Sequence, residues 1–239
     1  MVDKLHQVKF FQNPEIYRIN IDDGGLMSGH ESMFLIWKLL KYFNPKSILE
    51  IGFGAGQITG LFVEATQPAT KIISVDITDR YFNQFRNTFS DDNLTLIHLD
   101  SRNLELNEKF DFIYIDGDHT YDGVCNDLEK CLPLLDKTSV LCVDDYLDIA
   151  DVDRAIKEYL LGQHKFVPFL CGCQKIFFHH QDHDANEFLD SFIMHNSNDI
   201  LEFTTIDFFG FSVLKGQVTS LAIQKDAEIF KKMLEFYDH

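Results

Sequence analysis

Acidic side chains stand at or near the ends of several predicted β-strands in the first 150 residues. Short apolar runs predict these strands at residues 47–51, 71–75, 94–99, 110–115 and 139–143. The acids in or after them are Glu50, Asp76, Asp100, Asp116, Asp144 and Asp145. In an open α/β sheet the carboxyl ends of the strands form the edge where ligands bind. We therefore expect these carboxylates to converge on one edge.

Three of these carboxylates form a candidate metal site. One strand–helix–strand unit separates Asp116 from Asp144, so their strands should be neighbours, and Asp145 follows directly. Three gathered carboxylates repel one another unless a cation lies between them. Hard oxygen ligands favour Mg²⁺, with Mn²⁺ or Ca²⁺ as alternatives. In the other interpretation, Asp144 and Asp145 cap the following loop, and Asp116 only contacts a cofactor.

A glycine-rich turn follows the first of these strands. Gly52, Gly54 and Gly56 separate the strand at 47–51 from a predicted helix at 57–65. Glycines let the backbone approach a ligand closely, and the free N–H groups of a helix start can bind it. Glu50 is an acid in an otherwise apolar strand, which is costly to bury unpaired. It either orders the glycine loop beside a cationic ligand or is a strand-end charge satisfied by nearby N–H groups.

Asp76 lies at the tip of the next strand, about 20 residues after the last loop glycine. An acid at this distance is placed to accept both ribose hydroxyls of an adenosine ligand. The alternative is that Asp76 caps the helix that follows. The glycine loop before it favours the ribose interpretation. A dinucleotide fingerprint would have glycine or alanine where this chain has Gln57, which weakens a nicotinamide-cofactor alternative.

The stretch SILEIGFGAG resembles motif I of the class I S-adenosylmethionine (SAM) methyltransferases. The later runs IDGDHTYDGVCNDLE and VDDY are similar to the metal-dependent small-molecule O-methyltransferases, both the catechol type and the antibiotic- and sugar-tailoring group. The resemblance covers about residues 31–180. It implies a cofactor site at Glu50, Gly52, Phe53, Gly54, Gly56, Asp76, Ile77, Asp100, Ser101 and Asp116, and a Mg²⁺ site at Asp116, Asp144 and Asp145.

The resemblance also implies a catalytic base. Catechol-type relatives have a lysine three residues after the first metal-binding acid, and this chain has His119 there. Histidine is a suitable base near neutral pH, so His119 and Asp116 are the predicted catalytic residues. Alternatively, His119 only orients Asp116 or Asp144. The implied activity is metal-assisted O-methylation of a small-molecule hydroxyl on a sugar, natural product or catechol-like compound. The alternatives are an NAD-type oxidoreductase and a SAM-binding subunit without catalysis.

Alternating strands and helices predict a doubly wound, Rossmann-like α/β fold. We expect a mostly parallel seven-stranded sheet with helices on both faces. Residues 1–30 form an N-terminal segment, 31–180 the SAM-binding domain, and 181–239 a C-terminal α+β extension that is not an independent domain. In that extension we predict a hairpin of residues 208–213 and 218–223 around Lys215 and Gly216, then a helix at 226–237. Its Phe208, Phe209 and Phe211 should cover the acceptor site or form a subunit contact in a homo-oligomer.

Composition narrows the class of partner. A formal charge of −17 over 239 residues disfavours nucleic acid and anionic membrane surfaces, which Lys and Arg bind. No apolar run is long enough to span a bilayer, and the N-terminus lacks the apolar core of a signal peptide. Five cysteines, an odd number, suggest free thiols. We expect a cytoplasmic protein that acts on a small molecule.

Overall fold

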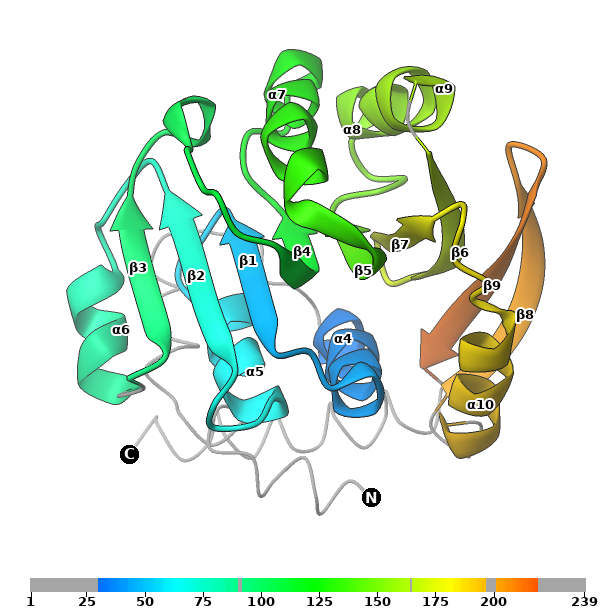
Figure 1. The fold of residues 1–239 in the computed structure, drawn as a ribbon, viewed down its shortest axis with the longest axis horizontal. Coiled ribbons are helices and arrows are strands. Elements are labelled where there is room, and N and C mark those ends of the chain that lie inside the picture. Colours follow the sequence, from blue (N-terminus) through cyan, green and yellow to red (C-terminus); the bar gives the residue numbers. More distant parts are fainter. Residues whose placement is uncertain (1–29, 90–91, 164, 197–200, 219–239) are drawn as a thin grey trace, which may run out of the picture.

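The computed structural model describes residues 30–89, 92–163, 165–196 and 201–218. One mixed sheet runs through the described part, in the order β3-β2-β1-β4-β5-β7-β6-β9-β8 (Figure 1). The strands are β1 Ser47–Ile51, β2 Lys71–Asp76, β3 Leu94–His98, β4 Phe110–Ile115, β5 Leu135–Val143, β6 Phe166–Gly172, β7 Lys175–His180, β8 Leu201–Phe208 and β9 Phe211–Val218. The first five are parallel, and β7 joins β5 antiparallel.

Helices cover both faces of this sheet. They are α4 His30–Phe43, α5 Gln57–Ala65, α6 Phe82–Thr88, α7 Tyr121–Cys131, α8 Ala150–Ala155, α9 Leu161–Gln163 and α10 Asn186–Asn196. Short 3₁₀ turns stand at η1 Ser101–Asn103 and η2 Leu132–Leu134, and a π-helical turn, η3 Ile156–Leu160, continues α8. Among the described residues, no helix is both long and apolar enough to cross a membrane.

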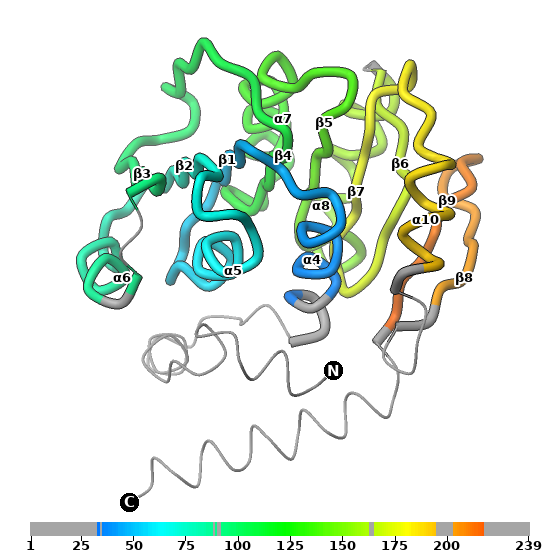
Figure 2. Tube along the Cα trace, turned by 60° about the horizontal axis from the view of Figure 1, so that its bottom comes forward, coloured from blue at the N-terminus to red at the C-terminus, as the bar shows by residue number. Residues whose placement is uncertain are grey.

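The two faces have separate cores because side chains alternate along each strand. On one face α4, α5, α6 and α10 pack on residues such as Ile48 and Phe112. On the other, α7, α8 and η3 pack on Leu49, Ile113 and Leu141 (Figure 2). Strands buried on both faces explain the near-continuous apolar runs in the sequence. The predicted doubly wound α/β fold is confirmed.

The strand number was underestimated. Seven strands, β1 to β7, make the expected sheet, but β8 and β9 extend it, so that it has nine. β9 joins the edge strand β6 through Leu170–Leu214 and Cys171–Lys215. An added hairpin there covers the edge that β6 would otherwise expose. Residues 201–218 of the predicted extension thus belong to the same sheet.

The predicted hairpin turn was wrong. The turn between β8 and β9 is at Phe209 and Gly210, both with positive φ, and not at Lys215 and Gly216. A positive φ at both central residues is typical of the two-residue hairpin turn. Gly216 instead lies inside β9, where its carbonyl oxygen stands 2.1 Å from the position of a Cβ on Gly172. The close approach of β6 and β9 therefore requires glycine at position 172. The predicted helix at 226–237 and the segment 1–29 lie outside the described residues.

Candidate functional site

The candidate site lies at the carboxyl ends of the parallel strands, at the top of Figure 1. Backbone hydrogen bonds continue past the last strand residues and fix the loops side by side. These bonds are Gly52 N–Val75 O at 2.9 Å, Asp116 N–Ile51 O at 2.8 Å, and Asp144 N–Ile115 O at 3.0 Å. The loops that carry the glycines and the predicted acids are therefore anchored to one another.

The glycine loop lies directly against the end of β4. Gly52 has φ +94°, and a Cβ there would be 1.9 Å from the carbonyl oxygen of Asp116. Gly56 has φ +83° and faces the rings of Phe53 and Phe85. Both the positive φ and the close contacts exclude a side chain at these positions. The glycines bring the loop backbone close to Asp116, as a ligand cradle requires.

Glu50 lies beneath this loop. Its side chain is fully buried, and the hydroxyl groups of Thr59 and Ser74 donate to its Oε2. Its Oε1 has no hydrogen-bond partner. Burial raises the pKa of Glu50 to about 8, although the two hydroxyls oppose that shift. Glu50 thus links β1, β2 and α5, and it does not line the cavity described below.

Asp76 accepts backbone hydrogen bonds from both sides of the site. Its Oδ2 accepts from Gly54 N at 2.8 Å, and its Oδ1 accepts from Thr78 N at 2.8 Å. The first contact links the tip of β2 to the glycine loop. The second is a local turn contact of the kind that the capping interpretation expected. Each carboxylate oxygen has a further lone pair for a ligand hydroxyl.

A cavity of about 300 Å³ opens between these loops and α7. Of the predicted cofactor residues, it is lined by Gly52, Gly54, Asp76, Ile77, Asp100, Ser101 and Asp116. Phe53 and Gly56 do not line it. Phe53 is buried, with its ring centroid 4.8 Å from that of Phe82 and 5.2 Å from that of Phe85. Phe53 therefore packs α6 against the glycine loop.

Beside the cavity, Asp116, His119 and Asp145 form a compact cluster. The Nε2 of His119 lies 3.1 Å from Asp116 Oδ1 and 3.2 Å from Asp145 Oδ2. One ligand atom of each residue lies within 4.8 Å of the others. The hydrogen bond that the His119 imidazole donates to Asp116 is the main factor that raises the pKa of His119, while burial raises the pKa of Asp116 to about 7. Asp145 has a positive φ of 56°, which turns the loop at this point.

Asp144 lies differently from the prediction. It is 5% exposed, and its Oδ1 accepts from Lys175 Nζ at 2.6 Å and from Asp145 N at 2.8 Å. The Tyr114 hydroxyl donates to its Oδ2. Lys175 is itself 1% exposed and comes from the antiparallel strand β7. The three side chains that lie close enough to share an ion are therefore Asp116, His119 and Asp145. Asp144, the third predicted ligand, instead forms an ion pair with the buried Lys175.

The fold and one sequence match identify the domain. Residues 49–146 match the model of a methyltransferase domain family. Over this stretch the chain is therefore similar to a methyltransferase domain.

Solved structures share the fold of this methyltransferase. An O-methyltransferase from Bacillus cereus in complex with SAH is 15% identical, with a TM-score of 0.56, over 71% of this chain and 89% of that chain. The O-methyltransferase TomG from Streptomyces achromogenes, involved in tomaymycin synthesis, is 12% identical, with a TM-score of 0.55, over 70% and 88%. A methyltransferase from Geobacter sulfurreducens is 15% identical, with a TM-score of 0.58, over 70% and 86%. A comparison with curated proteins gave no match.

The methyltransferase cavity fits SAM in size and charge. Its volume reaches the lower end of the range for small-molecule sites, about 300–1,000 Å³. Five aspartates line it: Asp76, Asp100, Asp116, Asp118 and Asp127. An acidic wall complements the sulfonium and ammonium groups of SAM. Asp76 and the loop glycines Gly52 and Gly54 lie in the wall of this cavity.

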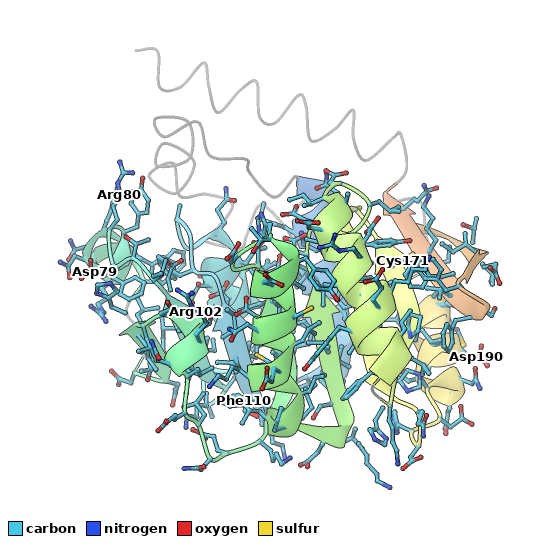
Figure 3. All side chains as sticks on the ribbon, turned by 90° about the horizontal axis from the view of Figure 1, so that it is seen from above. Asp79, Arg80, Arg102, Phe110, Cys171 and Asp190 are labelled. Atoms are coloured by element: carbon cyan, nitrogen blue, oxygen red, sulfur yellow. The ribbon has the colours of Figure 1, made fainter. Side chains whose placement is uncertain are left out.

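Several residues that line the methyltransferase cavity were not predicted: Arg102, Gly117, Asp118, Gly123, Asn126 and Asp127. Arg102 lies in η1, which packs against α7 (Figure 3). Positions 123, 126 and 127 share one face of α7 because residues three and four apart are neighbours on a helix. Gly123 lets α7 approach the preceding loop, since a Cβ there would be 2.5 Å from Asp118 Cγ. This helical spacing was the signal that sequence reasoning overlooked.

Proposed function

We propose that this methyltransferase transfers a methyl group from SAM to a hydroxyl oxygen of a small molecule, with the help of a divalent cation. The observation that carries the proposal is the cluster of Asp116, His119 and Asp145 at the edge of the cavity. Asp116 belongs both to this cluster and to the cavity wall. An acceptor oxygen held at the cluster would therefore be next to the cofactor.

The donor set of the cluster fits a divalent cation. Two carboxylates and an imidazole are partly exposed and close enough together to share one ion. An imidazole ligand moves the preference from Mg²⁺ toward Mn²⁺ or another transition metal. A cation bound there would lower the pKa of an acceptor hydroxyl and fix the position of its oxygen. Asp144 would hold the site from beneath, through its hydrogen bond to Asp145 N.

His119 has two possible roles, and they exclude each other at one atom. Its Nε2 is the atom that lies between the two carboxylates. If a cation binds at the cluster through Nε2, that nitrogen has no lone pair left for a proton. Without a cation, the two carboxylates hold the imidazole in place, and His119 would act as the base for the acceptor hydroxyl once Nε2 has lost the proton that these carboxylates favour. This second, metal-free candidate is supported by Lys175, which already neutralises one of the three predicted metal-binding acids.

The test combines cation binding with activity. Calorimetric titration of the wild type with Mn²⁺ should show one site, and Asp145→Asn should weaken it at least about tenfold. Asp148→Asn is the matched control, because Asp148 is exposed on the same loop and contacts Gln174. EDTA should abolish SAH release from SAM with a panel of catechols, sugars and other hydroxyl compounds. Full activity in EDTA would replace the metal-assisted proposal with the metal-free one.

The acceptor and the assembly remain proposals. A formal charge of −17 supports a small-molecule acceptor over nucleic acid or an anionic membrane. If the protein binds SAH but turns over none of the acceptors, the alternative of a SAM-binding subunit without catalytic activity would be favoured. We also propose a homo-oligomer, which sedimentation at several concentrations would test. A single monomer mass at all concentrations would contradict it.

A further inference from the structure

Asp127 is a buried acid that the proposed methyl transfer does not use. It is 1% exposed, lies on α7, and lines the cofactor cavity. Its Oδ2 has no hydrogen-bond partner. The other donors near this carboxyl are the Ser101 side chain and the side-chain nitrogen of Asn126, which lies 3.5 Å from Oδ1. Burial raises the pKa of Asp127 to about 6. A buried carboxylate oxygen without a donor is costly, so Oδ2 needs a hydrogen-bond donor that the described residues do not supply.

The position of Asp127 in the cavity indicates which part of the cofactor it faces. The ribose hydroxyls of SAM are assigned to Asp76 at the end of β2. The reacting sulfonium must lie toward Asp116, where the cavity meets the acid cluster. The adenine base would therefore occupy the remaining end of the cavity, which is formed by η1 and α7. These two elements pack against each other. Ser101 and Asp127 both line that end, and the Ser101 side chain is placed to hydrogen-bond to the Asp127 carboxyl.

The other acid at this end is already occupied. Asp100 accepts from Arg102 at both oxygens, with Oδ1 receiving the backbone N–H at 3.0 Å and Nε at 2.9 Å. Oδ2 receives Nε at 3.0 Å and Nη2 at 2.5 Å. A ligand amine would therefore have to displace the guanidinium of Arg102 to reach Asp100. Asp127 can accept such a hydrogen bond without breaking an ion pair.

We propose that the Asp127 carboxylate accepts a hydrogen bond from the 6-amino group of the adenine base and so selects adenine among purines. The amine supplies the donor that Oδ2 lacks. Gly117 keeps the approach open, since a Cβ at that position would be 2.7 Å from Asp127 Oδ2. The inference rests on the proposed SAM site and adds the residue that distinguishes the base.

The test measures a ratio of two affinities, so that a general loss of binding does not imitate the result. Calorimetry would compare SAH with its analogue that lacks the 6-amino group. The wild type should prefer SAH by at least about tenfold, the usual effect of one charge-assisted hydrogen bond. In Asp127→Leu, which keeps the side-chain size, the preference should fall to about twofold or less. The affinity of Asp127→Leu for the analogue without the 6-amino group should stay within about threefold of the wild-type value.

Two further variants keep the test decisive. Asp127→Asn retains a neutral acceptor and should fold where the leucine variant does not, with a preference between those of the wild type and Asp127→Leu. Asp122→Asn is the matched control, because Asp122 is an exposed acid on the same helix and does not line the cavity. It should keep the wild-type preference. An unchanged preference in the Asp127 variants, or no preference in the wild type, would overturn the inference. A wild type that binds neither compound would instead overturn the SAM site.

Discussion

At the scale of single residues, the sequence located the acids but not their partners. Asp116, Asp144 and Asp145 are at the strand ends, as predicted, because parallel strands end at the same edge. The cation that Asp144 needs is Lys175, on a strand that runs the other way. Nothing local in the sequence indicates that this lysine is buried. Its neighbours on β7, Ile176 and Phe177, are the apolar residues that carry it into the core.

The pair of Lys175 and Asp144 leads to a stability prediction. Lys175→Met should destabilise the protein by about 3–5 kcal/mol, because it leaves a buried carboxylate without its cation. The double variant Lys175→Met with Asp144→Leu should recover most of that loss, since no buried charge remains. Urea unfolding measures both. Lys71→Met is the control, because the Lys71–Glu108 pair is exposed and should contribute less than about 1 kcal/mol. Additive effects of the two core substitutions would contradict the predicted coupling.

Glu50 leads to a pH prediction. Its pKa is raised to about 8 in the folded state from the ordinary value of 4.5. As the pH rises between these values, the unfolded chain loses this proton while the folded chain keeps it. Glu50 therefore makes the folded state less stable with rising pH, by at most about 1.4 kcal/mol per unit. Glu50→Gln should remove this slope, because glutamine carries no titrating group. The variant should still fold, since its amide oxygen can accept from Thr59 and Ser74.

Chemical unfolding of the wild type and Glu50→Gln without cofactor, between pH 5 and pH 8, tests this prediction. The free energy of unfolding of Glu50→Gln, relative to that of the wild type, should increase as the pH rises. Glu108→Gln is the control, since Glu108 is exposed and paired with Lys71. A constant difference between wild type and Glu50→Gln across this range would mean that Glu50 is ionised in the folded protein.

At the scale of elements, periodicity predicted the strands and helices of the first 180 residues well, and local turn geometry decided the errors. Apolar residues at helical spacing, which are Val124, Leu128, Cys131 and Leu135, predict a helix over residues 121–135. In the structure α7 ends at Cys131 and β5 begins at Leu135. Pro133 lies in the 3₁₀ turn between them. The β8–β9 turn was misplaced because Lys215-Gly216 and Phe209-Gly210 both look like turns. Contact with β6 across the sheet, which the sequence does not reveal, keeps Gly216 in a strand.

The tip of this hairpin supports the loop that carries Asp145. The rings of Phe208 and Tyr146 meet edge to face, with centroids 5.1 Å apart, and Tyr146 directly follows Asp145. Phe208→Leu should therefore weaken Mn²⁺ binding at the cluster severalfold, because Tyr146 loses part of its packing. SAH affinity should stay within about twofold of the wild type. Calorimetry measures both.

Phe209→Leu is the matched control for the hairpin, because Phe209 is 52% exposed. It should leave both affinities unchanged. Equal losses in Phe208→Leu and Phe209→Leu would show that the hairpin acts through general stability and not through Tyr146. This experiment also bears on the predicted role of the phenylalanine-rich segment over the acceptor site, which stays a prediction.

At the scale of the whole molecule, one sheet brings together parts of the chain that are far apart in sequence. The glycine loop, the β2 tip, η1 and α7 form the cofactor cavity, while the loops after β4 and β5 form the acid cluster. The parallel half could be predicted from the sequence because each strand, turn and helix repeats the same pattern. The β6–β9 edge and the inward face of α7 depend on packing between distant segments, and the pattern did not reveal them.

The central claim is that this cavity binds SAM through the glycine loop and Asp76. Calorimetric titration of SAH into the wild type tests it most directly. We predict one site per chain, and at least about tenfold weaker binding by Asp76→Ala, which loses charge-assisted hydrogen bonds to the ribose. Circular dichroism would establish that the variant is folded, and Asp79→Ala, an exposed acid on the same loop, should bind like the wild type. Unchanged SAH affinity in folded Asp76→Ala, or no binding by the wild type, would contradict the account.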